Sequence, residues 1–395
     1  MSAASAVSKA INVADLERLA RRRLPKVVFD FLQGGAEDER TLYSNRAAYG
    51  KYELVPRILT GNSAPDLSVD LFGERCQLPF LIGPTGLNGL HWKGADIALA
   101  KAAAKAGTVF CLSTASNVSL ETAAAASAGS KWYQLYPWGD RSVCGRLMQR
   151  ARDAGYRVLI VTVDSLVAGK RERDVRNGFS HELRISPKVI VDGLLHPGWL
   201  VNTWLAGGGM PRFENVADFL AQGASASQLA EFTRSQRNAG LSWSDIAWMK
   251  SQWEGPLLVK GISALEDVPL ARAAGVDGLV ISNHGGRQLD GSPATLDLLP
   301  EFVAACGKEM PVLIDGGIRR GTDIVKALAL GARAVLLGRA TLYGVAAGGE
   351  AGASRALSIL RDELQRNLML LGTASVRSLT HSVLRRPNSF SAPVF

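Results

Sequence analysis

The chain has 395 residues, of which 47% are hydrophobic and 21% charged, a composition that supports a large buried core and excludes a largely disordered protein. Lysine and arginine (45) exceed aspartate and glutamate (36), and the resulting charge of +9 attracts anionic lipids, acidic substrates or nucleic acid without choosing among them. The four cysteines are far apart and form no C-x-x-C pair, so we expect a reduced, intracellular protein without a structural zinc.

No membrane-spanning segment is expected from the sequence. The N-terminus is small and polar and lacks the apolar core of a secretory signal. No run of about 18 uninterrupted apolar residues occurs. The nearest approach, residues 189–206, is interrupted by Asp192, His196, Pro197 and Gly198.

Eight short apolar runs alternate with helical patterns along the chain. The runs that we expect to be strands are Leu78–Gly83, Val109–Ser113, Trp132–Tyr136, Val158–Asp164, Leu257–Gly261, Gly278–Asn283, Val312–Gly316 and Ala334–Arg339. Several of the helical segments between them end at a glycine, as is typical of a helix C-cap: Gly107, Gly155, Gly275 and Gly331. Strands that are apolar on both faces are typical of parallel sheets.

This alternation predicts an α/β fold, specifically a (β/α)8 TIM barrel over about residues 78–372. A doubly wound sheet is the alternative, but its first strand would normally lead into G-x-G-x-x-G, whereas here it leads into GPTG. We expect a single domain over 1–395, with an N-terminal helical extension. A long insertion follows the fourth strand, at about residues 180–240 within a connection that runs from 165 to 251.

Polar residues stand where nearly every predicted strand ends, and the active site of a barrel lies at the carboxyl ends of its strands. The last two strands lead into Asp315-Gly316-Gly317 with Arg319, and into Gly338-Arg339. Glycine backbone and arginine charge at these two loops suit a phosphate group. Either sequence alone could equally be a tight turn, but together they favour a phosphorylated cofactor or substrate.

His284 lies in a glycine-flanked loop after the sixth strand, with Arg287 close behind it and Asp164 at the end of another strand. A carboxylate orients an imidazole and makes it a competent base, and an arginine can hold a substrate carboxylate through two hydrogen bonds. Lys260 ends an apolar strand and could form a Schiff base or face a developing negative charge. The five histidines show no metal-ligand cluster, so no metal is expected.

The sequence resembles the FMN-dependent L-2-hydroxy-acid oxidase and dehydrogenase family over about residues 11–380. The segments that carry the resemblance include PKVVFDFLQGGAEDE, LIGPTGLNG, WYQLY, TVD…GKRERD, LLVKGI, SNHGGRQLD, IDGGIRRGTDIVKALALGA and LLGRA. Two of them, GPTGLNG and LSTASN, are most similar to the mandelate dehydrogenases of this family.

The resemblance implies a bound FMN and a set of site residues. FMN would contact Pro84, Thr85, Gly86, Ser113, Gln134, Thr162, Lys260, Ser282, Asp315, Gly316, Gly317, Arg319, Gly338 and Arg339. Lys260 would stabilise the anionic reduced ring. His284 with Asp164 would be the base, Arg171 and Arg287 would bind the substrate carboxylate, and Tyr136 would lie near the reacting hydroxyl.

Two departures from the family pattern concern the substrate. The family usually has a tyrosine hydroxyl on the carboxylate where this chain has Phe31, a loss of about 1.5–3 kcal/mol unless another group replaces it. Glycolate oxidase has a tryptophan where this chain has Ala115, so we expect a larger pocket and a bulky, aromatic substrate side chain. Gly86 stands where oxidases tend to have alanine, and this favours a dehydrogenase that reacts slowly with oxygen.

The insertion contains many large apolar residues and has cations at its flanks, Lys188 and Arg212. The apolar residues are Ile190, Leu194, Leu195, Trp199, Leu200, Trp204 and Leu205. Such a segment could lie in a membrane interface, or it could be a lid or a subunit contact. The resemblance favours peripheral attachment at the cytoplasmic face of the cell membrane, with deletion of Val189–Gln228 leaving a soluble, FMN-bound enzyme.

We therefore expect oxidation of an L-2-hydroxy acid, (S)-mandelate to benzoylformate, with electrons passed to a quinone or another membrane acceptor. An L-lactate dehydrogenase or an oxygen-using oxidase is the alternative, and relatives form homotetramers. A phosphate-binding barrel acting as an isomerase or nucleotide dehydrogenase is a further possibility, but the latter would need a loop cysteine, and Cys306 falls in a predicted helix. No nucleic-acid motif is present, so no nucleic-acid partner is expected.

Overall fold

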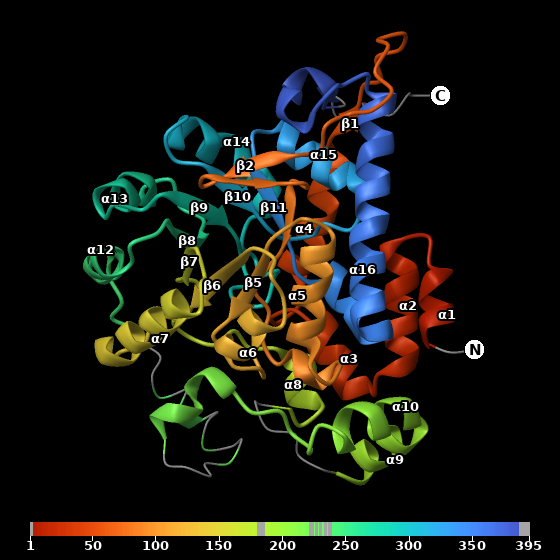
Figure 1. Ribbon diagram of the computed structural model, residues 1–395, viewed down its shortest axis with the longest axis vertical. Coiled ribbons are helices and arrows are strands. Elements are labelled where there is room, and N and C mark those ends of the chain that lie inside the picture. The colour runs from red at the N-terminus through yellow and green to blue at the C-terminus, as the bar shows by residue number, and fades with distance from the viewer. Residues whose placement is uncertain are drawn as a thin grey trace.

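Eight parallel strands form a closed barrel at the centre of the molecule (Figure 1). The computed structural model describes residues 3–179, 186–220, 225, 228, 231–232, 235 and 239–386. The barrel strands are β4 (Phe80–Ile82), β5 (Phe110–Ser113), β6 (Lys131–Leu135), β7 (Val158–Thr162), β8 (Leu257–Ile262), β9 (Gly278–Ile281), β10 (Val312–Ile314) and β11 (Ala334–Leu337). Each predicted strand overlaps one of them in chain order, and β11 closes the barrel against β4, so the predicted (β/α)8 fold is confirmed.

The barrel interior is filled by alternate side chains of the strands, because successive residues of a strand point to opposite faces. Leu81, Cys111, Ile160 and Leu258 belong to this inner cluster. A short hairpin of β2 (Val69–Leu71) and β3 (Glu74–Cys76) packs on the same cluster, and the ring of Phe72 lies edge-on to Trp132 at 5.7 Å. These side chains form an apolar core inside the barrel.

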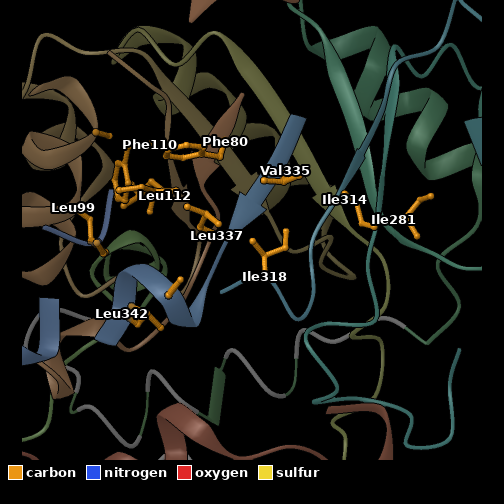
Figure 2. Close-up of a cluster of buried hydrophobic side chains, with 14 of the residues drawn as sticks. Phe80, Leu99, Phe110, Leu112, Ile281, Ile314, Ile318, Val335, Leu337 and Leu342 are labelled. Carbon is orange, nitrogen blue, oxygen red and sulfur yellow. The ribbon is translucent and has the colours of Figure 1, made fainter. Parts of the chain in front are cut away.

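Side chains on the outer face of the barrel pack against a surrounding layer of helices (Figure 2). These helices are α5 (Ala95–Lys105), α6 (Leu120–Ala125), α7 (Arg141–Asp153), α12 (Trp243–Gln252), α13 (Asp267–Ala273), α14 (Thr295–Cys306), α15 (Gly321–Ala329) and α16 (Arg339–Leu370). The predicted C-cap glycines 107, 155, 275 and 331 all have positive φ, as the sequence suggested. Within α16, Gly348 and Gly349 leave helical geometry and produce a kink.

The N-terminal extension is helical, as predicted, and consists of α1 (Ala3–Ser8), α2 (Val13–Arg23), α3 (Lys26–Gln33), α4 (Arg40–Ala47) and the turn η1 (Ala48–Lys51). Helices α1 and α2 lie along α16 (Figure 1). Helix α3 has buried apolar residues on most of its surface, and it carries Phe31 and Leu32 to the functional site.

The long connection after β7 forms short helices and no strand within its described residues: α8 (Glu172–Arg176), α9 (Pro187–Leu195), α10 (Pro197–Trp199), the π-helix η3 (Leu200–Leu205) and η4 (Glu214–Phe219). Trp199 Nε1 donates to Leu90 O at 2.7 Å, and Asn215 Nδ2 donates to Ser113 O at 3.2 Å. The connection is therefore attached to the loop after β4 and to the end of β5. Parts of the predicted insertion 180–240 lie outside the described residues.

The remaining elements are short and peripheral. They are β1 (Glu53–Leu54) paired with β12 (Leu384–Arg385), and the turns η2 (Asn88–Leu90), η5 (Val376–Ser378) and η6 (His381–Val383). Among the helices of the described residues, none is both long enough and apolar enough to cross a bilayer.

Candidate active site

A cavity of about 400 Å³ opens at the carboxyl ends of the barrel strands. Every strand contributes to its wall through the loop or residue that ends it, and α3 contributes Phe31 and Leu32. A volume in this range suits a cofactor or a drug-sized ligand. The predicted site residues that line it are Phe31, Pro84, Thr85, Gly86, Ala115, Tyr136, Thr162, Arg171, Lys260, His284, Arg287, Asp315, Gly316, Gly317, Arg319, Gly338 and Arg339.

The other predicted residues stand behind this wall and contact groups that form it. Ser113 Oγ donates to Gln134 Oε1 at 2.7 Å, and Ser282 Oγ accepts from Lys260 Nζ at 2.6 Å. Asp164 contacts the ring of His284 and is itself almost wholly buried. The structure thus brings together all of the predicted site residues. One group lines the cavity, and the other group lies behind it and contacts the lining residues.

His284 is held in an uncommon backbone conformation, with φ of 58°. A positive φ is rare outside glycine, and its presence in a loop at a cavity indicates that the surrounding structure imposes it. Its backbone N–H donates to Ser282 Oγ at 3.1 Å, and its Nδ1 lies 2.8 Å from Asp164 Oδ1. With Nδ1 engaged by the carboxylate, Nε2 is the nitrogen left to act on a ligand. The ring also stacks on Tyr136 at 6.5 Å.

The Asp164 carboxylate is kept ionised by its neighbours. Burial alone would raise its pKa, but the charge and hydrogen bond of His284 and the charge of Lys260 outweigh burial and lower it. Gly261 makes room for this carboxylate, since a Cβ there would come within 2.6 Å of the Asp164 Cβ. Gly261 also stands at a register shift between β8 and β9, which redirects the strand next to Lys260.

Lys260 is a buried cation on the wall of the cavity, with only 5% of its surface exposed. Its ammonium lies 3.0 Å from Asp315 Oδ2 and donates to Ser282 Oγ. Burial would lower its pKa, but the charges of Asp315 and Asp164 outweigh burial and raise it. The ammonium therefore stays protonated, so a Schiff-base nucleophile, which must be neutral, is disfavoured.

Two guanidinium groups, Arg171 and Arg287, lie on the same side of the cavity, 5.7 Å and 5.1 Å from the Phe31 ring. Burial and the like charges of Arg171 and Arg339 hold the pKa of Arg287 well below its usual value. Arg287 Nη1 donates to Phe31 O and Gly34 O, each at 2.8 Å, while Arg171 has an ion pair with Asp174 at 3.5 Å. An anion bound between the two arginines would relieve their mutual repulsion.

Arg319 and Arg339 differ in how they are engaged. Arg339 donates to the backbone oxygens of Leu32, Gly34 and Gly285, so it fixes the N-terminal loop over the His284 loop, and burial lowers its pKa to about 10. Arg319 Nη1 donates only to its own neighbour Ile318 O, and its Nε has no hydrogen-bond partner in the described chain. Arg319 is therefore the more available cation for a phosphate.

Several buried polar atoms around the cavity have no partner among the described residues: Gln134 Nε2, Thr162 Oγ1, Asp315 Oδ1 and Arg319 Nε. Buried polar groups are normally hydrogen-bonded, so this cluster indicates a ligand rich in donors and acceptors. FMN fits, because its flavin ring presents carbonyl oxygens and ring nitrogens and its phosphate suits Arg319 and the glycines 316 and 317. Both of these glycines have positive φ, and a Cβ on Gly317 would meet Asn45 O at 2.1 Å.

The lining of the cavity also includes apolar residues, namely Leu87, Ala115, Trp138, Phe179 and Phe213. Gly86 contacts Ala115 closely, since a Cβ built on it would lie 2.8 Å from the Ala115 Cβ. Both residues are small, so this part of the cavity is open to a bulky apolar group.

Three residues of the site were not found from the sequence. Asp174, in α8, lines the cavity beside Arg171. Asp96 is buried behind the wall, where it accepts from Ser116 Oγ at 2.6 Å and Asn88 Nδ2 at 2.7 Å and so joins the loops after β4 and β5. His91, at the end of η2, lines the cavity beside Phe31. The signal for Asp174 was present in GKRERD, whereas no sequence pattern distinguished the other two.

Within the described residues, no group of histidine, cysteine, aspartate and glutamate has the arrangement of a metal site. All four cysteines are buried and unbridged. Cys306 is the last residue of α14, as predicted, and it does not line the cavity.

Comparison with known proteins identifies the family. The model of FMN-dependent dehydrogenases matches residues 20–386. The chain is 44% identical to (S)-mandelate dehydrogenase of Pseudomonas putida, covering 97% of this chain and 96% of that one. It is 42% identical to L-lactate oxidase of a Nostoc species, covering 96% and 99%.

The structure also resembles solved structures. A crystal structure of the monotopic membrane protein (S)-mandelate dehydrogenase superposes with a TM-score of 0.92 at 43% identity, covering 96% of this chain and all of that one. The chain is therefore a member of the FMN-dependent dehydrogenase family, among its 2-hydroxy-acid dehydrogenases, and its cofactor is FMN.

Proposed function

We propose that this enzyme oxidises the 2-hydroxy acid (S)-mandelate to benzoylformate and passes the electrons to a quinone or another membrane acceptor. The observation that carries this proposal is the convergence of the His284–Asp164 pair, two guanidinium groups and an apolar wall on one cavity. These three features correspond to the reacting carbon with its hydroxyl group, the carboxylate and the aromatic side chain of such a 2-hydroxy acid.

The substrate carboxylate is assigned to Arg171 and Arg287. Two adjacent cations that repel each other form a strong site for one anion, and a guanidinium can bind a carboxylate through two parallel hydrogen bonds. With the carboxylate held there, the 2-hydroxyl group lies near Tyr136 and the base.

The oxidation removes two protons and two electrons from the substrate. His284 Nε2 accepts one of the protons, and FMN, when bound, would take the electrons and the other proton. Asp164 is ionised, so it stabilises the imidazolium that forms and keeps the ring oriented through the 2.8 Å contact at Nδ1. Removal of the α-carbon proton and removal of the hydroxyl proton both require this same base.

FMN, when bound, accepts the two electrons that leave the α-carbon. The residues that would hold it are those predicted from the resemblance, with Lys260 supplying a permanent positive charge towards the reduced ring. Arg319 and the backbone N–H groups of Gly316 and Gly317 would hold its phosphate.

The choice of mandelate rests on the open apolar part of the cavity at Ala115 and Gly86 and on the similarity to the mandelate dehydrogenase. The competing proposal is oxidation of L-lactate with oxygen as acceptor, which the similarity to a lactate oxidase favours. Steady-state turnover of both acids, each with a soluble dye and with oxygen, separates the two. Our proposal requires a higher kcat/KM for (S)-mandelate and faster turnover with the dye; preference for lactate and oxygen would contradict it.

Membrane attachment is assigned to an exposed apolar face on α9 and η3, which we call the α9 face. It consists of Ile190, Val191, Leu194, Leu195, Val201 and Leu205, each at least half exposed. Four of these residues follow the spacing of one side of a helix. Trp199, expected in the membrane interface, is instead buried, and Trp204 packs on it at 5.5 Å. These tryptophans attach the segment to the barrel, and the exposed leucines insert into the bilayer at the cytoplasmic face.

The double variant Leu194→Glu, Leu195→Glu is expected to lose vesicle binding while it keeps FMN and its activity with a soluble dye. Each leucine that inserts contributes about 1.5–3 kcal/mol, so partitioning falls by about 10²–10⁴-fold. Co-sedimentation with anionic lipid vesicles measures this.

Met369→Glu, Leu370→Glu is the matched control, because these residues are also exposed but lie at the far end of α16. Equal binding of both variants would contradict the assignment. Point variants are preferable to removal of Val189–Gln228, which would also remove the support that Asn215 gives to the β5 loop.

A homotetramer is the assembly that we propose from the resemblance. Light scattering in detergent should then give about four times the chain mass of 42.1 kDa. A mass of one chain would contradict it.

A further inference from the structure

Gln288 follows Arg287 in the loop after β9 and lies on the wall of the cavity. Its side-chain amide is bonded to the backbone of the loop after β7. Its Nε2 donates to Asp164 O at 2.8 Å and to Val167 O at 3.1 Å, and its Oε1 accepts from Gly169 N at 3.0 Å. A glutamine amide has two N–H donors, so both are used here and neither is left for a ligand.

The loop after β7 depends on such contacts, because it has no regular structure of its own. Strand β7 ends at Thr162 and α8 begins at Glu172, with no helix or strand between them. The loop is also partly open to solvent, since 72% of Val167 is exposed. It contacts the β9 loop directly, and a Cβ on Gly169 would lie 2.3 Å from Arg287 O. The three hydrogen bonds of Gln288 therefore hold the two loops together.

Each of the two pairs assigned to the reaction has one member on each of these loops. Asp164, on the β7 loop, lies 2.8 Å from His284 on the β9 loop. Arg171, just before α8, lies over the same Phe31 ring as Arg287 of the β9 loop. A displacement of about 1 Å can slow a reaction by about 10²-fold. Any change in the spacing of the loops would therefore affect both pairs.

We infer that Gln288 is a positioning residue that sets the spacing of both pairs, His284 with Asp164 and Arg287 with Arg171. It acts by fixing the backbone of the β7 loop at three points, and not by contact with the substrate or the flavin. The inference rests on the proposed function, which assigns the base to the first pair and the carboxylate to the second.

The test uses two substitutions of Gln288 in the FMN-bound enzyme. Gln288→Met has a similar length but makes none of the three hydrogen bonds. Gln288→Glu keeps an acceptor for Gly169 N, but as a carboxylate it cannot donate to the two carbonyl oxygens. Gln149→Met is the matched control, because the Gln149 amide bonds to Asp153 on α7 and does not line the cavity. Visible absorbance and Tm establish that each variant is folded and contains FMN.

The first measurement is the binding of phenylacetate, followed through the flavin spectrum. Gln288→Met and Gln288→Glu should each weaken binding by about 10-fold, and Gln149→Met should leave it unchanged. In an Arg171→Met background, Gln288→Met should weaken binding by less than about 2-fold, because the group that it would misplace is already absent.

The second measurement is the rate of anaerobic flavin reduction at saturating (S)-mandelate. Gln288→Met should slow it by about 10–100-fold in the parent, but by less than about 3-fold in an Asp164→Asn background. A role limited to support of the fold would give the same factor in both backgrounds, with a lower Tm or a loss of FMN.

Two results would overturn the inference. One is phenylacetate binding and flavin reduction in Gln288→Met that match the parent. The other is an effect of Gln288→Met that is as large in the Arg171→Met and Asp164→Asn backgrounds as in the parent. If L-lactate but not mandelate reduced the parent flavin, the proposed substrate would be wrong, and the same comparisons with L-lactate would still decide the role of Gln288.

Discussion

Replacing His284 with alanine is expected to slow anaerobic reduction of the bound FMN by (S)-mandelate by about 10⁴-fold, the upper end of the range for a general base. The reason is geometric, because His284 lines the cavity and its Nδ1 is engaged by Asp164, which leaves Nε2 as the proton acceptor that we propose. Stopped-flow absorbance of the flavin measures the reduction directly, without an external acceptor.

The Asp164→Asn variant is the companion to this experiment. It keeps a hydrogen-bonding group near Nδ1 but removes the negative charge, so the imidazolium loses its stabilisation and reduction should slow by about 10²–10³-fold. Both variants should bind FMN normally. If His284→Ala reduced its flavin as fast as the parent does, the role assigned to the pair would be wrong.

Replacing Arg287 with methionine should lower kcat/KM for (S)-mandelate by about 10²–10⁴-fold, since two charge-assisted hydrogen bonds of about 1.5–3 kcal/mol each are lost. The loss should also appear as weaker binding of phenylacetate, a carboxylate that cannot react. Steady-state kinetics and titration of the flavin spectrum measure the two effects.

Arg171→Met separates binding from support of the fold. Arg287 also donates to two backbone oxygens of the N-terminal extension, whereas the Arg171 guanidinium has an ion pair with Asp174 and no hydrogen bond to the backbone of the described residues. We expect Arg171→Met to weaken phenylacetate binding without lowering Tm. Unchanged carboxylate binding in both variants would refute the assignment.

The barrel was predictable because its signal is local. Each strand is a short apolar run, each of the four glycine-ended helices identified in the sequence has its cap at a positive-φ glycine, and the order along the chain alone specifies the architecture. The convergence of His284, Arg287 and Lys260 then followed from the rule that parallel strands present their carboxyl ends on one side. Only His284 and Arg287 are close to each other in the sequence.

The sequence could not predict which of the site residues line the cavity and which lie behind them. Gln134 and Ser282 end strands just as Lys260 does, but the pleat and the bulge at Gly261 decide which side chains reach the cavity. Arg339 was expected to contact FMN and it lines the cavity, but the sequence did not indicate that its Nε, Nη1 and Nη2 also donate to backbone oxygens. Those oxygens belong to loops that lie far from Arg339 in sequence.

The insertion and His91 show a second limit of prediction from the sequence. Tryptophans and leucines of residues 189–206 cannot be distinguished by composition, yet Trp199 is buried and Leu195 is 73% exposed. The segment is held by two hydrogen bonds, from Trp199 Nε1 to Leu90 O and from Arg23 Nη2 to Thr203 Oγ1. His91 follows a short 3-10 turn with no periodicity. Only its contacts in space show that its ring nitrogens lack partners.

The most direct measurement is an anaerobic titration of the purified yellow protein with (S)-mandelate, followed through the flavin absorbance. If the base, the two arginines and FMN share one cavity, one equivalent of the acid per bound FMN bleaches the flavin completely, and an equal amount of mandelamide, which lacks the carboxylate, does not. Bleaching by the amide as readily as by the acid, or no bleaching by any 2-hydroxy acid, would contradict this arrangement.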